Sequence, residues 1–354
     1  MTQPAKPIFK THASIELGQH GDKDLATAAA YSKANGGGGI LPSIYHLMKD
    51  PATSWAFKDP AEIRSILEAG EVQFDGASMH CLFWVLGTAF SGSPTIRPFL
   101  PPSMHNASIA EIEAFAEDGV LKALDLLAAL DRKVIPMFWG TYYSWEVISG
   151  YPWGFWSGPG YDLVKEGDER LVTKTQKVRD HARTNGQFLA HEIHGNTAAR
   201  CASDFRRLLK LTDNDPVIRV WGDPSHCAFG ETWEQRFRDI GEYVDGTHIK
   251  DFARRQGELL QIQPDWKLRA HKFCRLGDGE VDLVGYVELM WTCGAIRRFC
   301  EKNGVTSCGL AAEAESDFYP VTQCGAHGIN WVKDNLLFVP PSASFQDTMG
   351  APAE

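Results

Sequence analysis

Apolar and polar positions follow two alternating periods along this chain. From about residue 60 onward, stretches with apolar residues three or four positions apart alternate with short apolar runs typical of buried strands. The stretches with helical spacing are 59–70, 108–131, 169–186, 197–212, 232–244 and 281–304. The runs that predict strands are 72–80, 133–140, 187–195, 216–226, 246–252 and 307–316. Ser108 stands where a helix N-cap is expected, which supports the second helix of the series.

Repeated alternation of helix and strand without hairpin signals predicts a parallel sheet covered by helices. With one further strand expected in the first 60 residues, the pattern suits an α/β fold, a closed (β/α)8 TIM barrel that takes in residues 1–354 as a single domain. An open, doubly wound sheet is the alternative. The stretch NGGGG (35–39) does not fit the G-x-G-x-x-G pattern of a dinucleotide-binding turn, so we interpret it as a flexible loop.

The last four predicted strands end in residues that would be out of place in an apolar core. In the stretch FLAHEIHGN (188–196), side chains alternate between two faces, so Glu192 and His194 point the same way. Burying both without partners would be costly, so they need a metal, a charge network or solvent. In a TIM barrel the carboxyl ends of all strands meet at one face, where active sites are built. The residues at the other three strand ends are Asp223 and His226, His248 and Lys250, and Glu313 and Glu315.

Several of these residues also have an ordinary structural explanation. The stretch DPSH (223–226) is typical of a turn in which Asp223 caps the next segment. His248 would by itself fit a hydrogen-bonded core histidine, and Glu315 a solvated loop carboxylate. The spacing of the whole set over four strands favours a metal site instead. A set rich in oxygen donors with one imidazole suits Mn²⁺, Mg²⁺ or Co²⁺ better than a structural zinc ion.

The same strand ends carry a resemblance to a known family. The stretches EIHGN, DPSH, THIKD, GDGEVD (277–282) and AAEAESD (311–317) occur in this order. Together they resemble the sugar-phosphate isomerase/epimerase family of xylose isomerase-like TIM barrels, over about residues 130–338. The resemblance implies one divalent cation, with Mn²⁺ favoured, and a substrate near His226. The cation ligands that it implies are Glu192, Asp223, His248 and Glu313.

A bound cation of this kind would make the proton next to a sugar carbonyl acidic by stabilising the enediolate that forms when the proton leaves. The candidate proton acceptors are Glu192, Glu313 and His194, and a histidine has a pKa near working pH. Return of the proton at another position gives isomerisation or epimerisation. Loss of a group β to the carbonyl gives elimination from the same intermediate. A sugar isomerase or epimerase is therefore expected, with a lyase as the alternative.

An aromatic-rich segment, residues 138–161, contributes to the choice between these outcomes. We expect it either to pack against the barrel rim or a subunit interface, or to form a pocket for a planar group. This segment, the insertion 253–277 and His194 resemble the large subunits of bacterial C-glycoside deglycosidases, which eliminate aromatic aglycones from 3-keto sugars and bind a small subunit. The further candidates for contact with a sugar or glycoside are His80, Trp139, His226 and Lys250.

Composition argues against several other classes of function. The 35 basic and 45 acidic residues give a net charge of −10, which disfavours nucleic acid or an anionic membrane as the partner. A DNA-repair enzyme of the endonuclease IV type would need a three-zinc cluster and a basic groove, and a non-catalytic barrel would be expected to have lost its ligands. Eight cysteines without a CxxC pair, no signal peptide and no apolar span predict a cytoplasmic protein with reduced thiols. We expect a homo-oligomer, or a hetero-oligomer with a small subunit.

Overall fold

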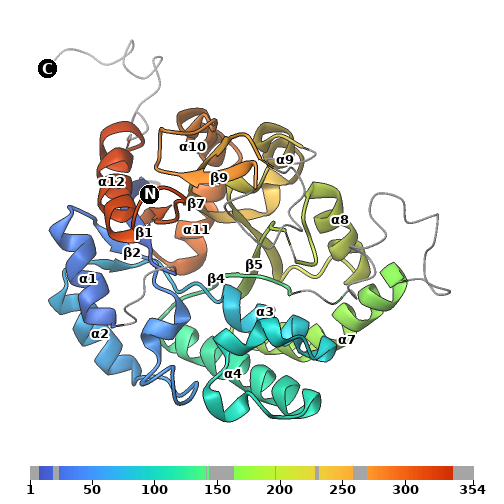
Figure 1. The fold of residues 1–354 in the computed structure, drawn as a ribbon. Coiled ribbons are helices and arrows are strands. Elements are labelled where there is room, and N and C mark those ends of the chain that lie inside the picture. The colour runs from blue at the N-terminus through green and yellow to red at the C-terminus, as the bar shows by residue number, and fades with distance from the viewer. Residues whose placement is uncertain are drawn as a thin grey trace, which may run out of the picture.

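A barrel of parallel strands forms the centre of the molecule in the computed structural model (Figure 1). The structure describes residues 8–18, 24–140, 142, 163–195, 197–227, 231–257 and 269–337. The parallel strands of the barrel are β1 (Lys10–Glu16), β2 (Gly39–Ile40), β3 (Gln73–Phe74), β4 (Val134–Met137), β5 (Phe188–Glu192), β6 (Ile218–Gly222), β7 (Val244–Ile249) and β10 (Ser307–Glu313).

The strands close into a ring in the order of a TIM barrel. Six of them form one continuous sheet in the order β1-β10-β7-β6-β5-β4, and β2 pairs with β3. The backbone N–H of Leu41 donates to the carbonyl of Ile15 at 2.8 Å, which joins β2 to β1. The N–H of Met79 donates to the carbonyl of Pro136 at 2.9 Å, which joins the segment after β3 to β4. The predicted closed barrel is therefore confirmed.

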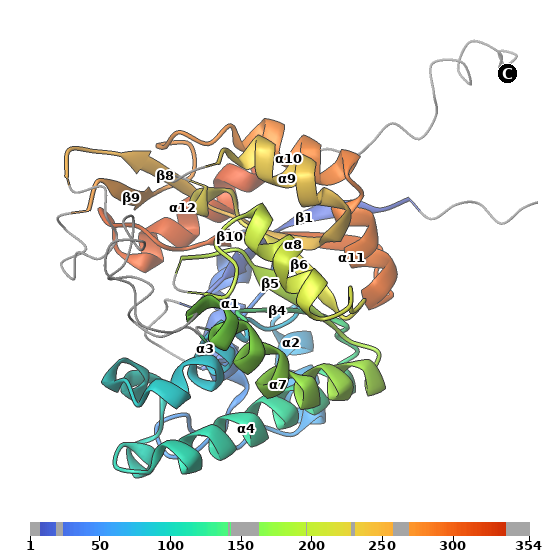
Figure 2. The ribbon, with the colours of Figure 1, turned by 90° about the vertical axis from the view of Figure 1, so that its right-hand side faces the viewer.

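Helices surround the barrel on its outer side (Figures 1 and 2). The predicted cap of α4 (Ile109–Ala129) is present, because Ser108 and Glu111 form a reciprocal capping box. The predicted helix 281–304 is two helices, since Gly294 adopts a left-handed conformation with φ of 80° between them. The helices are α1 (Leu25–Ala34), α2 (Pro60–Ala69), α3 (His80–Thr88), α4 (Ile109–Ala129), α7 (Leu163–Thr184), α8 (Ala202–Leu211), α9 (Trp233–Ile240), α10 (Leu283–Thr292), α11 (Ala295–Asn303) and α12 (Val321–Asn335).

Some sequence predictions were wrong. The first 60 residues hold two strands rather than one. The predicted strand 72–80 is much shorter, and its last residue, His80, begins α3. Helix α3 was missed because it is buried on almost every side and therefore has no polar face to reveal its period.

An antiparallel hairpin projects from the barrel, although the sequence predicted no hairpin (Figure 2). It consists of β8 (Asp251–Arg254), which overlaps the start of the predicted insertion 253–277, and β9 (His271–Cys274), which lies within it. The strands are joined by a connection far longer than the two to five residues of an ordinary hairpin turn, so no turn signal was available. Residues 258–268 of the insertion lie outside the described residues, as does most of the aromatic segment 138–161.

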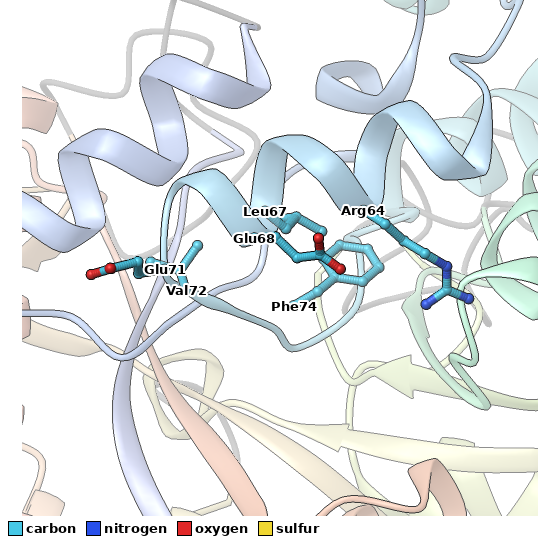
Figure 3. Close-up of a pocket in the computed structure, with 6 residues that line it drawn as sticks. All are labelled: Arg64, Leu67, Glu68, Glu71, Val72 and Phe74. Carbon is cyan, nitrogen blue, oxygen red and sulfur yellow. The ribbon is translucent and has the colours of Figure 1, made fainter.

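The amino-terminal ends of the strands carry a groove that is separate from the rim at their carboxyl ends. It lies between the second half of α2 and the turn into β3 (Figure 3). Arg64 at its edge is paired with Asp131 at 2.8 Å. The groove is lined by Arg64, Leu67, Glu68, Glu71, Val72 and Phe74.

No helix of the described residues has both the length and the apolar character required to span a membrane.

Candidate metal centre

Four side chains converge where β5, β6, β7 and β10 reach the carboxyl-terminal rim of the barrel. Glu192 is the last residue of β5, and Asp223 follows β6 directly. His248 lies near the end of β7, and Glu313 is the last residue of β10. One ligand atom from each lies within 4.8 Å of the others. The structure thus brings together the four residues that the sequence nominated as cation ligands.

The imidazole of His248 lies close to two of the carboxylates. Its Nδ1 lies 3.0 Å from Oε2 of Glu192 and 3.4 Å from Oε2 of Glu313.

The two carboxylate oxygens of Asp223 have different partners. Its Oδ1 accepts the backbone N–H of Ser225 at 2.7 Å, and its Oδ2 lies 3.3 Å from Nε2 of His226. The predicted turn-capping role and a place in the cluster therefore coexist in one carboxylate.

The donor atoms fit a divalent cation. Asp223 Oδ2, Glu313 Oε2 and His248 Nδ1 are shielded from solvent, and each lies 3.0–3.4 Å from an oppositely charged group without good hydrogen-bond geometry. Buried polar atoms normally have hydrogen-bond partners, so atoms that lie close together without hydrogen-bond geometry need another explanation. Ligand atoms that point at a common cation position lie close together in this way. Three carboxylates with one imidazole are a donor set suited to Mn²⁺ or Mg²⁺.

Three further histidines border the four donors. His80 Nε2 lies 3.0 Å from Glu192 Oε2, and His226 Nε2 lies 3.3 Å from Glu192 Oε1. The ring of His194 lies 4.0 Å from the ring of His226, centroid to centroid. His80 thus reaches the cluster from the first turn of α3 rather than from the predicted strand. All three are in position to contact a molecule bound over the cluster.

Lys250 lies beside the cluster and is buried. Its Nζ donates to Glu313 Oε1 at 2.9 Å, forms an ion pair with Glu315, and lies 3.9 Å from the centroid of the Phe273 ring. Glu315 is therefore more than a solvated loop carboxylate, although its side chain is 30% exposed. Together the two glutamates balance a lysine charge that would be costly to bury alone.

Trp139 is not brought to the cluster. Its side chain is fully buried and packs edge-on against Phe83 at 6.0 Å, while its backbone N–H donates to Nδ1 of His191 at 3.1 Å. The preceding residue, Phe138, lies there instead, with its ring 4.4 Å from that of His80. Adjacent residues of an extended segment face opposite ways. The sequence analysis therefore selected Trp139, one position after the residue that faces the cluster.

The hairpin supplies residues that the sequence reasoning missed. The ring of Phe273 lies 5.5 Å from that of His226, and the ring of His271 stacks on Phe252 at 4.9 Å. Alternation along β9 places His271 and Phe273 on one face, and this pattern could have identified them in the sequence. It could not be used because β9 was not predicted as a strand.

Electrostatics divide the buried cluster into anionic and cationic members. Burial opposes ionisation of Glu192, but His248 and His80 outweigh it and hold the pKa of that carboxyl well below its usual range. Burial also opposes the charged form of His248, yet Glu192 raises its pKa to about 9. Asp223 likewise overcomes burial and raises the pKa of His226 to about 9. In the metal-free protein, imidazolium protons therefore neutralise the carboxylates.

Two other groups at the cluster have pKa values that shift in the opposite directions, upward for a carboxyl and downward for an imidazole. Burial raises the pKa of Glu313 to about 8, despite the opposing charges of Lys250 and His248. Burial lowers the pKa of His194 to about 3, helped by the nearby charge of His226. His194 is therefore uncharged at neutral pH. Glu313 is the carboxyl of the cluster that gains a proton most readily.

Comparisons with known proteins agree with the geometry. The family model of the xylose isomerase-like TIM barrels matches residues 90–311, so the chain belongs to this family. No curated protein matches the chain. The family resemblance found in the strand-end motifs is therefore confirmed.

Solved structures share the fold at low sequence identity. A xylose isomerase-like TIM barrel protein from Mycobacterium smegmatis in complex with magnesium has a TM-score of 0.57 and 16% identity, covering 93% of this chain and 96% of that one. The 3-keto-D-glucoside 4-epimerase from E. coli has a TM-score of 0.54 and 13% identity, covering 92% and 100%. The D-psicose 3-epimerase from Clostridium cellulolyticum H10, solved with D-tagatose, has a TM-score of 0.56 and 13% identity, covering 93% and 100%.

Proposed function

We propose that this protein is a divalent-metal-dependent enzyme that isomerises or epimerises a sugar by removing a proton next to a carbonyl group. The observation that carries the proposal is the convergence of donor atoms from Glu192, Asp223, His248 and Glu313 at the carboxyl-terminal rim of the barrel. The family match supports it, and so do two structural neighbours that are sugar epimerases.

Those four residues would hold the cation, with Mn²⁺ favoured and Mg²⁺ or Co²⁺ as alternatives. The neighbour from M. smegmatis was solved with magnesium, which supports a hard divalent ion. When bound, such an ion polarises a substrate carbonyl and stabilises the enediolate formed from it. The protons on His226 and His248 would be displaced by the ion, because its positive charge replaces theirs.

Glu192, Glu313 and His194 are the candidate proton acceptors. A general base works best when its pKa lies near the working pH. The pKa of about 8 for Glu313 is that of the metal-free protein, and a bound cation would lower it. His194 is a neutral imidazole at neutral pH, and its Nδ1 donates to the carbonyl of Gly195, so its Nε2 is able to accept a hydrogen bond from a sugar hydroxyl. His80, His226 and Lys250 would hold further hydroxyl groups of the substrate.

Deuterium exchange tests the proposal directly. The purified protein, loaded with Mn²⁺ in D₂O, is incubated with free ketoses and with 3-keto sugars, and mass spectrometry and NMR follow label and products. We expect deuterium at the carbon next to the carbonyl together with an epimer or isomer. Glu192→Ala should abolish both while circular dichroism remains unchanged. Absence of exchange into every keto sugar tested would contradict the proposed chemistry.

A lyase is the second candidate, and the placement of two aromatic rings favours it. Phe138 lies against His80, and Phe273 lies against His226, so two rings from separate elements border the cluster. Such rings stack well on a planar aglycone. The same assay is therefore extended to a 3-keto C-glycoside. Release of the free aglycone would assign the lyase activity, and epimer formation without release would reject it.

A further inference from the structure

A buried arginine outside the cluster contacts both loops that carry cluster residues. Arg236 lies in α9, whose first turn is fixed by a capping box between Thr232 and Gln235. Its side chain is fully buried. A guanidinium has five N–H donors and a permanent charge, so burial requires several acceptors around it. Those acceptors show which parts of the chain Arg236 holds.

The acceptors come from the segments that follow β5 and β6. Nη1 of Arg236 donates to the carbonyl of Ile193 at 3.4 Å. Nη2 donates to the carbonyls of Arg200 at 3.1 Å and His226 at 3.2 Å. Nε donates to the carboxylate of Glu231 at 2.5 Å. One rigid, planar group therefore ties together the backbones of two loops.

One of these carbonyls adjoins a donor of the cluster in the chain, and another belongs to a histidine that borders the cluster. Ile193 stands between Glu192 and His194 in the chain. His226 carries the imidazole whose Nε2 lies 3.3 Å from both Glu192 and Asp223. Because the backbone fixes where each side chain begins, movement of either carbonyl would move donor atoms of the candidate site.

Glu231 adds a second anchor to the same arrangement. Its carboxylate balances the charge of Arg236 and accepts the backbone N–H of Ala202, the first residue of α8, at 3.1 and 3.3 Å. The start of α8 is thereby fixed to the same guanidinium. The segment between β5 and α8 is thus held at both of its ends.

We propose that Arg236 is a positioning residue of the candidate metal centre. By holding the carbonyls of Ile193 and His226, it keeps the donors at the ends of β5 and β6 directed toward those of β7 and β10. The proposal rests on the proposed function for its account of the cation, whereas the contacts of Arg236 stand independently of it. Outer groups that orient metal ligands typically contribute tenfold to hundredfold in metal affinity.

The test compares Arg236→Lys with Arg179→Lys. Arg179 in α7 is also buried and donates to Asp215 at 2.9 Å, but Asp215 precedes β6 at the other end of the barrel. A lysine keeps the charge, yet its single nitrogen does not span acceptors spread along a guanidinium fork. Isothermal titration with Mn²⁺ should show affinity about tenfold or more weaker for Arg236→Lys, and within about twofold of wild type for Arg179→Lys.

Hydrogen exchange of the metal-free proteins provides a second readout. Amides of 191–195 and 223–227 should exchange about tenfold faster or more in Arg236→Lys, with no such change in Arg179→Lys. Wild-type exchange and affinity in Arg236→Lys would overturn the proposal, and so would equal losses in both variants, which would indicate general stability. If the wild type binds no Mn²⁺, the proposed function fails, and the exchange comparison alone decides the role of Arg236.

Discussion

Replacement of Asp223 with asparagine separates the two roles of this side chain. The amide oxygen of an asparagine can still accept the backbone N–H of Ser225, so the turn after β6 is retained. The charge on the other oxygen, which faces the cluster, is lost. Asp223→Asn should therefore weaken binding of a divalent cation without unfolding the loop.

The size of the effect follows from linkage. A ligand present at a hundredfold excess over its Kd stabilises the folded state by about 2.7 kcal/mol. With an unfolding entropy of about 2.1 cal/mol/K per residue, the 354 residues of this chain give about 0.74 kcal/mol/K. Mn²⁺ at that concentration should thus raise the Tm of the wild type by about 4 °C. If Asp223→Asn lowers affinity about a hundredfold, the same concentration gives about 0.4 kcal/mol, a shift below about 1 °C.

Thermal unfolding with and without Mn²⁺ measures both shifts. Asp245→Asn is the matched control, because Asp245 is a buried carboxylate near the start of β7, paired there with Arg219, Arg298 and Lys302. It should lower the Tm in the absence of metal and keep the full response to Mn²⁺. A wild type that does not respond, or an Asp223→Asn variant that responds fully, would refute the assignment of this carboxylate as a ligand.

Three more predictions concern the scaffold of the site. Gly246→Ala should cost about 1–3 kcal/mol in urea unfolding, because a Cβ at this position would overlap the ring of Trp221; unchanged stability would show that the ring moves freely. Ser108→Ala should cost about 1 kcal/mol through loss of the α4 cap, measured in the same way, and an effect near zero would contradict the capping role. Burial lowers the pKa of His191 to about 4, so the unfolded chain takes up this proton first as pH falls below about 6.5 and stability decreases toward pH 4. Between pH 7.5 and 5 this residue should lower the free energy of unfolding by about 2 kcal/mol. Urea unfolding of His191→Gln at the two pH values should no longer show this loss. An equal loss in the variant would assign it to other groups.

The sequence revealed the donors of the cluster because polar residues at the ends of apolar strands violate the expected burial pattern. Glu192 and Asp223 stand out in this way, and the barrel geometry then requires the strand ends to meet. The fold could be predicted for a similar reason, since the alternation of the two periods is strong after residue 60.

The parts that were missed depend on contacts that the local pattern does not encode. Trp139 was nominated although Phe138 faces the cluster, since the sequence does not fix the register of the short strand β4 to one residue. Phe273 was missed because β9 pairs with a strand far away along the chain. The role of Arg236 was hidden because its acceptors are backbone carbonyls, which every sequence contains.

The anchoring of Asp223 by the main chain has a consequence for ion selectivity. One oxygen held by the N–H of Ser225 limits rotation of the carboxylate, so this ligand of the proposed site is oriented before any ion arrives. A preassembled cage spares the ion the entropy of ordering its ligands, but it adapts poorly to ions of a different radius. If the site holds the cation proposed above, Ca²⁺, which prefers six to eight oxygens at longer distances, should therefore compete weakly with the smaller Mn²⁺ or Mg²⁺.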